Sequence, residues 1–183
     1  GASIGVDIDI AGEYVEKIHN ATKDRKSLLF IKLTPNVDNI GEIAKRVVDM
    51  GADGITAINT VGPGLHIDPV SNTPILQNAL GGKGGKSGRW VYSKALEAIK
   101  EIRRYIPDSV PIIGMGGVWS EKECFELIEA GADAVGIGSV LGHVRQPQWP
   151  LFFSALKKGA QDLLDGRECD FSSKKYVSDE RQM

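Results

Sequence analysis

The chain has 183 residues, the usual length of one domain, and its 42% hydrophobic and 25% charged residues are ordinary for a soluble globular protein. Its net charge of −2 argues against nucleic acid or an anionic membrane surface as a partner. No apolar run approaches the ~20 residues that span a bilayer, and the two distant cysteines, Cys124 and Cys169, suit a reducing, cytoplasmic compartment.

The first third of the chain alternates between helical and strand-like patterns. An amphipathic helix is expected over about 10–21, and a short apolar strand over 28–33. Apolar residues at helical spacing predict a helix over 40–50, which Gly51-Ala-Asp53 ends because glycine tolerates a left-handed conformation. The β-favouring segment 54–60 is expected to form the next strand.

The same alternation continues to the end of the chain. Ser120 and Glu123 form the sequence signature of a capping box, so a helix should begin at Ser120. Gly131-Ala-Asp133 repeats the earlier turn from helix to strand. The other expected elements are a helix over 87–105, a strand over 110–115, a strand over 134–138, a helix over 150–164 and a polar tail over 165–183.

Four strand-then-helix units indicate an α/β fold with a parallel sheet, whose nearly continuous apolar strands should be buried on both faces. An open doubly wound sheet and a closed (β/α)8 TIM barrel both satisfy this pattern. Glycines after the third and fourth strands favour the barrel, because phosphates often bind after strands seven and eight. We therefore expect residues 1–183 to supply strands 5–8 of one barrel domain. The chain starts at Gly1 without Met and without a secretory signal, which fits a missing upstream half.

The segment 61–86 is a long connection rich in glycine and proline. Loops beyond about 12–15 residues in compact domains usually carry function, so a substrate-facing lid is expected here. Its end, 81–88, resembles a P-loop, but that motif needs a glycine where Leu80 stands and should follow a buried strand. We therefore exclude a nucleoside triphosphatase.

Glycines at the ends of two neighbouring strands predict a phosphate site. Gly116-Gly117 and Gly138-Ser139 leave backbone N–H groups bare, and a following helix N-terminus favours an anion. Either pair alone would fit a tight turn, but the two pairs, one βα unit apart, favour phosphate binding. A carboxylate at Gly117 is expected to weaken that binding more than it harms folding.

Three further residues suggest a cofactor and its substrate. Lys32 lies within an apolar strand, and a buried lysine is costly unless an anion or acceptor partners it. Its alternative is a lysine that reaches out to solvent. Asn59 and Thr60 end a strand and suit a planar polar substrate, although turn chemistry would also explain them.

The histidines and cysteines predict neither a metal site nor a catalytic base. His19, His66 and His143 lack metal-ligand spacing with each other and with the cysteines. Cys124 lies among apolar residues of an expected helix, so a packing role is the default.

The chain from about 10 to 164 resembles the class 1 dihydroorotate dehydrogenases. The resemblance rests on the order and spacing of five motifs: Phe30–Asn36, Ile58–Thr60, Gly84–Gly88, Ile113–Gly117 and Ile137–Ser139. It implies an FMN-binding TIM barrel that oxidises dihydroorotate to orotate, a CH–CH oxidoreductase of pyrimidine biosynthesis. A homo-oligomer and an electron-transfer subunit are further expected partners.

By the same resemblance, each candidate residue acquires a role. Lys32 would contact the flavin ring, with Gly88 and Ile58 along its edge. Asn59 and Thr60 would bind the substrate. The residues expected at the flavin phosphate are Gly116, Gly117, Gly138 and Ser139.

Two departures from the family pattern limit the resemblance. Lys86 stands where family members usually have leucine. The family's base, a cysteine in an Asn-x-x-Cys-Pro-Asn loop upstream, has no counterpart here, so no catalytic residue is assigned and the segment alone is expected to be inactive. The alternatives are a dihydropyrimidine dehydrogenase-like flavin domain and a non-catalytic phosphate-binding barrel subunit.

Overall fold

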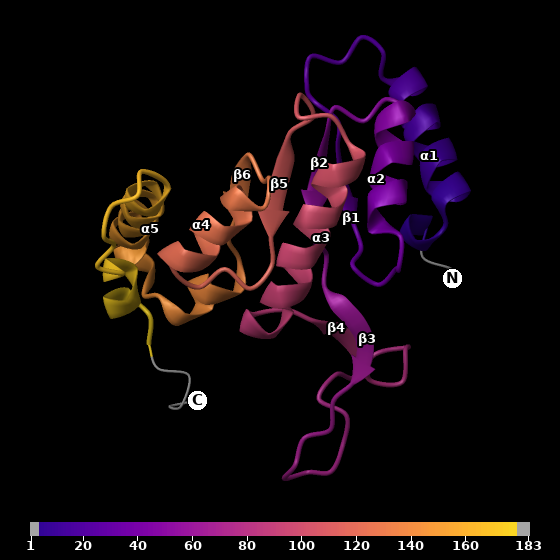
Figure 1. Ribbon diagram of the computed structural model, residues 1–183. Helices are drawn as coiled ribbons and strands as arrows, with labels where there is room; N and C mark the ends of the chain where they lie inside the picture. Colours follow the sequence, from indigo (N-terminus) through magenta and orange to yellow (C-terminus); the bar gives the residue numbers. More distant parts are fainter. Residues whose placement is uncertain (1–3, 179–183) are drawn as a thin grey trace.

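A computed structural model describes residues 4–178 of the chain. Four parallel strands form one sheet: β1 (Phe30–Leu33), β2 (Gly54–Ala57), β5 (Ile112–Met115) and β6 (Ala134–Gly136). The α/β class and the parallel sheet are as predicted. The strands lie side by side in chain order (Figure 1), without the reversal that marks a doubly wound sheet.

Five α-helices accompany the sheet: α1 (Ile8–Ala21), α2 (Ile40–Asp49), α3 (Tyr92–Tyr105), α4 (Glu121–Glu129) and α5 (Trp149–Leu164). Consecutive helices contact one another from α1 to α5, so they form a continuous outer layer (Figure 1). The capping box of Ser120 and Glu123 is present at the start of α4. The helix expected from Ser87 begins at Tyr92, because a 3-10 turn, η2 (Arg89–Val91), precedes it. Within residues 4–178, no helix combines the length and the apolar character that crossing a membrane requires.

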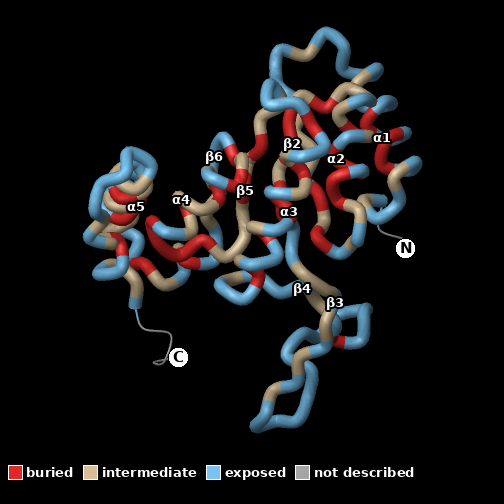
Figure 2. The backbone as a smooth tube through the Cα atoms, in the orientation of Figure 1, coloured by how far each residue is buried: buried red, intermediate tan, exposed pale blue. Residues whose placement is uncertain are grey.

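The helices cover only one face of the sheet, so the prediction that the strands are buried on both faces is wrong. The register aligns Leu33, Ala57 and Gly114, all of which are buried beneath the helices. The neighbouring row on the opposite face runs from Lys32, which is exposed, through half-buried Thr56 and Ile113 to exposed Ala134. Nothing in the described part of the chain covers this second face, and the core therefore lies between sheet and helices (Figure 2).

The aspartates of the two Gly-Ala-Asp turns, Asp53 and Asp133, make matching contacts with the neighbouring strand. The Asp53 carboxylate accepts the N–H of Leu29 at 2.6 Å and pairs with Arg25 at 2.7 Å. The Asp133 carboxylate accepts the N–H of Ile112 at 2.8 Å and pairs with Arg103 at 2.8 Å. Each aspartate thus fastens the strand that it introduces to the neighbouring strand before it.

The segment predicted as a loop over 61–86 contains a β-ribbon. β3 (Val61–Leu65) pairs antiparallel with β4 (Lys83–Lys86), and Val61 faces Lys86 at its base. The ribbon projects away from the sheet (Figure 1), and most of its outer part is exposed (Figure 2). The sequence concealed these strands, because four glycines and a proline occupy five of the nine strand positions, where β-favouring side chains normally indicate a strand.

The tail after α5 is ordered as far as the structure describes it. It contains a 3-10 turn, η5 (Ser172–Tyr176), in which Ser173 is completely buried. Glu121 at the start of α4, also completely buried, accepts the N–H of Ser173 at 2.7 Å and its hydroxyl at 2.6 Å. The last five residues of the expected tail, 179–183, lie outside the described residues.

Candidate functional site

A cavity of about 190 Å³ lies at the carboxyl ends of the four parallel strands, and we call it the site cavity. In parallel α/β folds this edge is where ligands bind. Its lining includes all nine predicted site residues: Lys32, Ile58, Asn59, Thr60, Gly88, Gly116, Gly117, Gly138 and Ser139. Segments that are far apart in the sequence therefore meet at one place.

Backbone hydrogen bonds continue past the end of β2 and fix the site residues that follow it. The N–H of Ile58 donates to the carbonyl of Met115 at 2.9 Å, and the N–H of Asn59 donates to that of Leu33 at 2.9 Å. Ile58 is buried, whereas Asn59 and Thr60 are exposed. The amide and the hydroxyl are thus held by neighbouring strands and remain open to a ligand.

The base of the β3–β4 ribbon forms a second wall of the site cavity. Asn36 donates to the carbonyl of Thr60 at 3.1 Å and accepts the N–H of Gly62 at 2.9 Å, which ties the loop after β1 to the ribbon. A Cβ at Gly85 would lie 2.1 Å from the Thr60 hydroxyl oxygen, so only glycine allows this approach. The ribbon thereby brings Lys86 to the cavity.

The glycine-containing loops after β5 and β6 carry backbone N–H groups that are available to a ligand. The N–H groups of Gly117, Gly138 and Ser139 make no hydrogen bond to another residue within 4–178. At Gly138 a Cβ would meet no atom within 4 Å, so an incoming group has room there. A 3-10 turn, η3 (Ser139–His143), follows Gly138 in place of an α-helix, so the anion-binding contribution comes from the N–H groups more than from a helix dipole.

The expectation for a carboxylate at Gly117 is wrong on structural grounds. Gly117 has φ +73°, and a Cβ there would lie 2.8 Å from the backbone nitrogen and Cα of Tyr92 at the start of α3. Any side chain would therefore strain the backbone and displace the helix. Gly138, with φ −137°, is the position where a charge can be added without that collision.

The ammonium of Lys32 is not buried, contrary to the prediction. Its side chain projects from the uncovered face of the sheet and is exposed, and it forms no ion pair within the described residues. Lys86, also exposed, adds a second ammonium to the same cavity. No carboxylate lines the site cavity in the described chain, so the cavity suits an anionic or electron-rich ligand.

Six lining residues were not predicted: Lys86, Ser87, Val91, Met115, Val118 and Gly136. Three of them, Ser87, Met115 and Val118, directly precede or follow predicted site residues, so their position next to the motifs was the available signal. Lys86 stood out only as a departure from the family pattern, and the ribbon that places it was not visible in the sequence.

The structure places Cys124 and two of the histidines as follows. Cys124 is buried on α4, and this burial raises the pKa of its thiol to about 12, so it is no base at neutral pH. His19 contacts the carbonyl of Gly51 at 3.1 Å, and His66 borders a separate cavity beside Lys86 and Trp90. Within residues 4–178, no cluster of three or more His, Cys, Asp or Glu side chains could hold a metal ion.

Known proteins resemble this chain over most of its length. The family model described as dihydroorotate dehydrogenase matches residues 2–157. A dihydroorotate dehydrogenase B (NAD(+)) catalytic subunit from Methanocaldococcus jannaschii is 42% identical over 139 residues, which cover 76% of this chain and 42% of that protein. The corresponding subunit from Oceanobacillus iheyensis is 39% identical, with 76% and 43% covered. A dihydroorotate dehydrogenase A (fumarate) from Lactobacillus delbrueckii subsp. bulgaricus is 37% identical, with 76% and 42% covered.

These relatives are longer than the chain, which spans about two fifths of their length. The matched segment nevertheless contains the complete four-stranded sheet and every residue that lines the site cavity. By its sequence and by the family model that matches most of its length, the chain belongs to the dihydroorotate dehydrogenase family.

Proposed function

We propose that the chain is the carboxyl-terminal half of an FMN-dependent (β/α)8 barrel that oxidises dihydroorotate to orotate in pyrimidine biosynthesis. The observation that carries the proposal is the convergence of all nine predicted site residues on one cavity at the carboxyl ends of the strands. The family membership supports it, and so do the names of the relatives.

The half-barrel is supported by the strand order and by the uncovered face of the sheet. Strands that follow one another in chain order, with helices on one side only, are what one sector of a barrel requires. The face that carries Lys32, Thr56 and Ile113 would then line the barrel interior. We assign the four strands to positions 5–8, and an upstream half of the same domain would supply the rest.

The lining of the site cavity suits the phosphate and the ring edge of a flavin mononucleotide. The bare N–H groups of Gly117, Gly138 and Ser139 suit a phosphate, and the open space at Gly138 lets it approach the backbone. Lys32 would lie against the isoalloxazine ring, with Ile58 and Gly88 along its edge. When bound, FMN supplies the capacity to accept a hydride.

The residues of this chain would orient the substrate and stabilise charge. The amide of Asn59 and the hydroxyl of Thr60 offer both donors and acceptors to the planar ring of dihydroorotate, and their backbone is fixed by the sheet. The ammonium of Lys32 stabilises negative charge that develops beside it during the transfer. Lys86 lies in the same cavity and complements a substrate carboxylate.

The base that removes the substrate proton comes from outside this chain. Neither cysteine lines the site cavity, and burial raises the pKa of Cys124 to about 12. The proposed upstream half would contribute it, which agrees with the expectation that residues 1–183 alone are inactive. Because two of the relatives are named as catalytic subunits, we also propose an electron-transfer subunit as a partner, in a homo-oligomeric cytoplasmic enzyme.

The test is anaerobic reduction of the full-length protein. The purified protein should carry FMN, and dihydroorotate should bleach its visible absorbance while dihydrouracil should not. Retention of FMN with bleaching by dihydrouracil alone would favour a dihydropyrimidine dehydrogenase. A protein that binds no flavin would refute the proposed function.

A further inference from the structure

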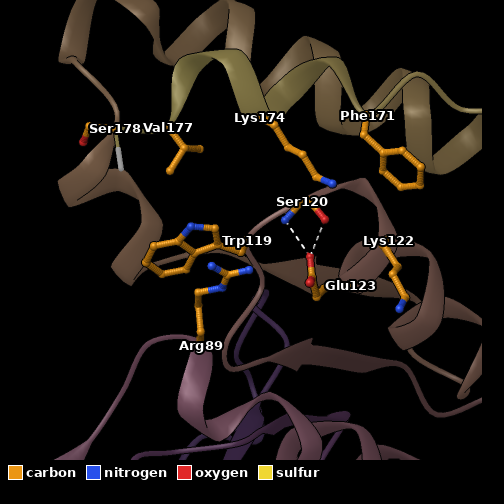
Figure 3. A pocket seen from close by; sticks show the side chains of 9 residues that line it. All are labelled: Arg89, Trp119, Ser120, Lys122, Glu123, Phe171, Lys174, Val177 and Ser178. Carbon is orange, nitrogen blue, oxygen red and sulfur yellow. Dashed lines mark hydrogen bonds between the residues drawn. The ribbon is translucent and has the colours of Figure 1, made fainter. Parts of the chain in front are cut away.

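A second cavity, of about 320 Å³, lies between the loop after β5, the start of α4 and the tail, and we call it the tail cavity. Figure 3 shows Arg89 and Lys174 reaching it from opposite sides, with Ser120 and Glu123 between them. Trp119 and Phe171 supply its aromatic walls. None of these residues belongs to the site cavity.

The lining of the tail cavity is basic, although the whole chain has a net charge of −2. Three cations line it, namely Arg89, Lys122 and Lys174, against the single carboxylate of Glu123. Within residues 4–178, Arg89 and Lys174 form no ion pair, whereas Lys122 lies 3.7 Å from Glu126. Among the described residues, three cations against one carboxylate leave the lining with a net positive charge, which favours an anionic occupant.

The one carboxylate in the lining is already engaged. Glu123 accepts the N–H of Ser120 at 2.7 Å and its hydroxyl at 2.6 Å, which is the capping box of α4 (Figure 3). Its carboxylate is therefore held at the helix start, and within residues 4–178 it forms no ion pair with Arg89 or Lys174.

Arg89 and Lys174 are exposed, and each cation lies beside an aromatic ring. The Arg89 guanidinium lies 5.6 Å from the centre of the buried Trp119 ring, and the Lys174 ammonium lies 4.7 Å from that of Phe171. The tail that carries Lys174 is fastened by the completely buried hydrogen bonds between Ser173 and Glu121. The backbone at Lys174 is therefore fixed in place, because Lys174 directly follows the buried Ser173.

At two places in the chain, consecutive residues line different cavities. Gly88 lines the site cavity and Arg89 the tail cavity, and likewise Val118 lines the first and Trp119 the second. An occupant that contacts Arg89 and Trp119 would therefore touch two segments that also line the site cavity.

We propose that the tail cavity binds a small phosphate-bearing molecule, distinct from the flavin. Its volume lies in the range of small-molecule sites. The fork of a guanidinium and the point charge of an ammonium together suit phosphate oxygens. An acidic peptide would instead require an exposed groove or a sheet edge, and the tail closes this cavity on one side.

The probe is inorganic pyrophosphate, titrated calorimetrically into the full-length protein at fixed ionic strength. Saturating FMN is present, so that the loops after β5 and β6 are filled. The wild-type protein should bind one equivalent, and Arg89→Ala and Lys174→Ala should each weaken binding about tenfold or more. Lys175→Ala is the matched control, because Lys175 is the next residue of the same exposed turn but does not line the tail cavity.

Three outcomes would overturn the proposal. Equal weakening by Lys175→Ala would show a general basic surface, and absence of binding to the wild type would show no site. Binding of a glutamate-rich peptide but not pyrophosphate, with the same dependence on Arg89, would replace a phosphate site with a protein-docking site. Loss of pyrophosphate binding in Arg89→Ala with FMN binding intact separates this site from the proposed flavin site. If FMN does not bind at all, the same variants still report on the tail cavity.

Discussion

Single residues in the site cavity act through the atoms they expose or lack. Lys32 contributes an ammonium on the uncovered face of the sheet, and Gly138 contributes space. Gly117 contributes a backbone conformation that other residues rarely adopt, because its φ is +73°. These three roles lead to different consequences of substitution, although all three residues line the same cavity.

Lys32→Ala should slow flavin reduction and leave the fold intact. Removing one preorganised charge beside developing negative charge typically costs about 100- to 1,000-fold in rate. The stability change should stay within about 0.5 kcal/mol, because the side chain is exposed. Stopped-flow reduction by dihydroorotate measures the rate, with exposed Lys26→Ala as the control. Rates for Lys32→Ala and wild type that agree within about threefold would contradict the role proposed for Lys32.

Gly138→Asp should release the flavin without unfolding the protein. The substitution adds a negative charge where the phosphate is proposed to bind, and like charges in a partly dry site repel by several kcal/mol. Gly138→Ala, which adds a Cβ into open space, should retain most of the flavin. Gly117→Ala should instead lower the melting temperature, because its Cβ meets the backbone of Tyr92. Flavin content and melting temperature are measured for all three, and normal flavin content in Gly138→Asp would mean that the phosphate binds elsewhere.

At the scale of elements, carboxylates that accept hydrogen bonds connect neighbouring strands and connect the tail to α4. Asp53 and Asp133 each join a strand to the one before it, and Glu121 joins α4 to the tail. The N–H of Leu29, and then Arg25, hold the pKa of the Asp53 carboxyl below its usual value. A lowered pKa means that the ionised Asp53 stabilises the folded chain above the unfolded-state pKa near 3.9, and this contribution is lost as the pH falls through the folded pKa.

Asp53→Asn should therefore destabilise the protein at neutral pH and much less in acid. We expect a loss of about 1 kcal/mol near pH 7, since the carboxylate is partly exposed and solvent screens the pair. Denaturant unfolding at several pH values should show the difference from wild type shrinking below about pH 4. Asp49→Asn removes only an exposed helix pair with Lys45 and should change stability by about 0.5 kcal/mol or less. A pH-independent difference for Asp53→Asn would contradict the assignment.

Ser173→Ala should loosen the tail from α4. It removes the hydroxyl donor to a completely buried carboxylate, which costs about 1–3 kcal/mol. Ser172→Ala is the control, because the Ser172 hydroxyl makes no hydrogen bond within the described residues. Limited proteolysis should cleave the Ser173→Ala variant faster after α5. Equal cleavage of both variants would show that the hydrogen bond from Ser173 to Glu121 does not hold the tail.

At the scale of the whole molecule, the uncovered face of the sheet determines how the chain behaves by itself. Phe30, Ile113 and Met115 are only half-buried there, although apolar strand residues of this kind usually lie in a core. We expect residues 1–183 produced alone to aggregate or to melt without cooperativity in circular dichroism and gel filtration, and the full-length protein to melt as one unit. A sharply melting monomer of the short chain would contradict the half-barrel.

The sequence by itself determined the order of the helices and of the four strands of the parallel sheet, and nine of the residues that meet at the site cavity. It did so because helix and strand periodicity, glycine turns and short motifs such as Gly116-Gly117 are local signals. The capping box of Ser120 and Glu123 is such a signal, and the structure has it where it was expected.

Only the tertiary structure decided which face of the sheet is covered, where Lys86 lies and what the tail does. Lys32 is exposed because helices pack on one side alone, and strand hydrophobicity cannot reveal which side. Lys86 reaches the site through a ribbon whose glycines hide its strand character, and Glu121 meets Ser173 across 52 residues of chain. These contacts join residues distant in sequence, so their energies depend on packing that no local pattern encodes.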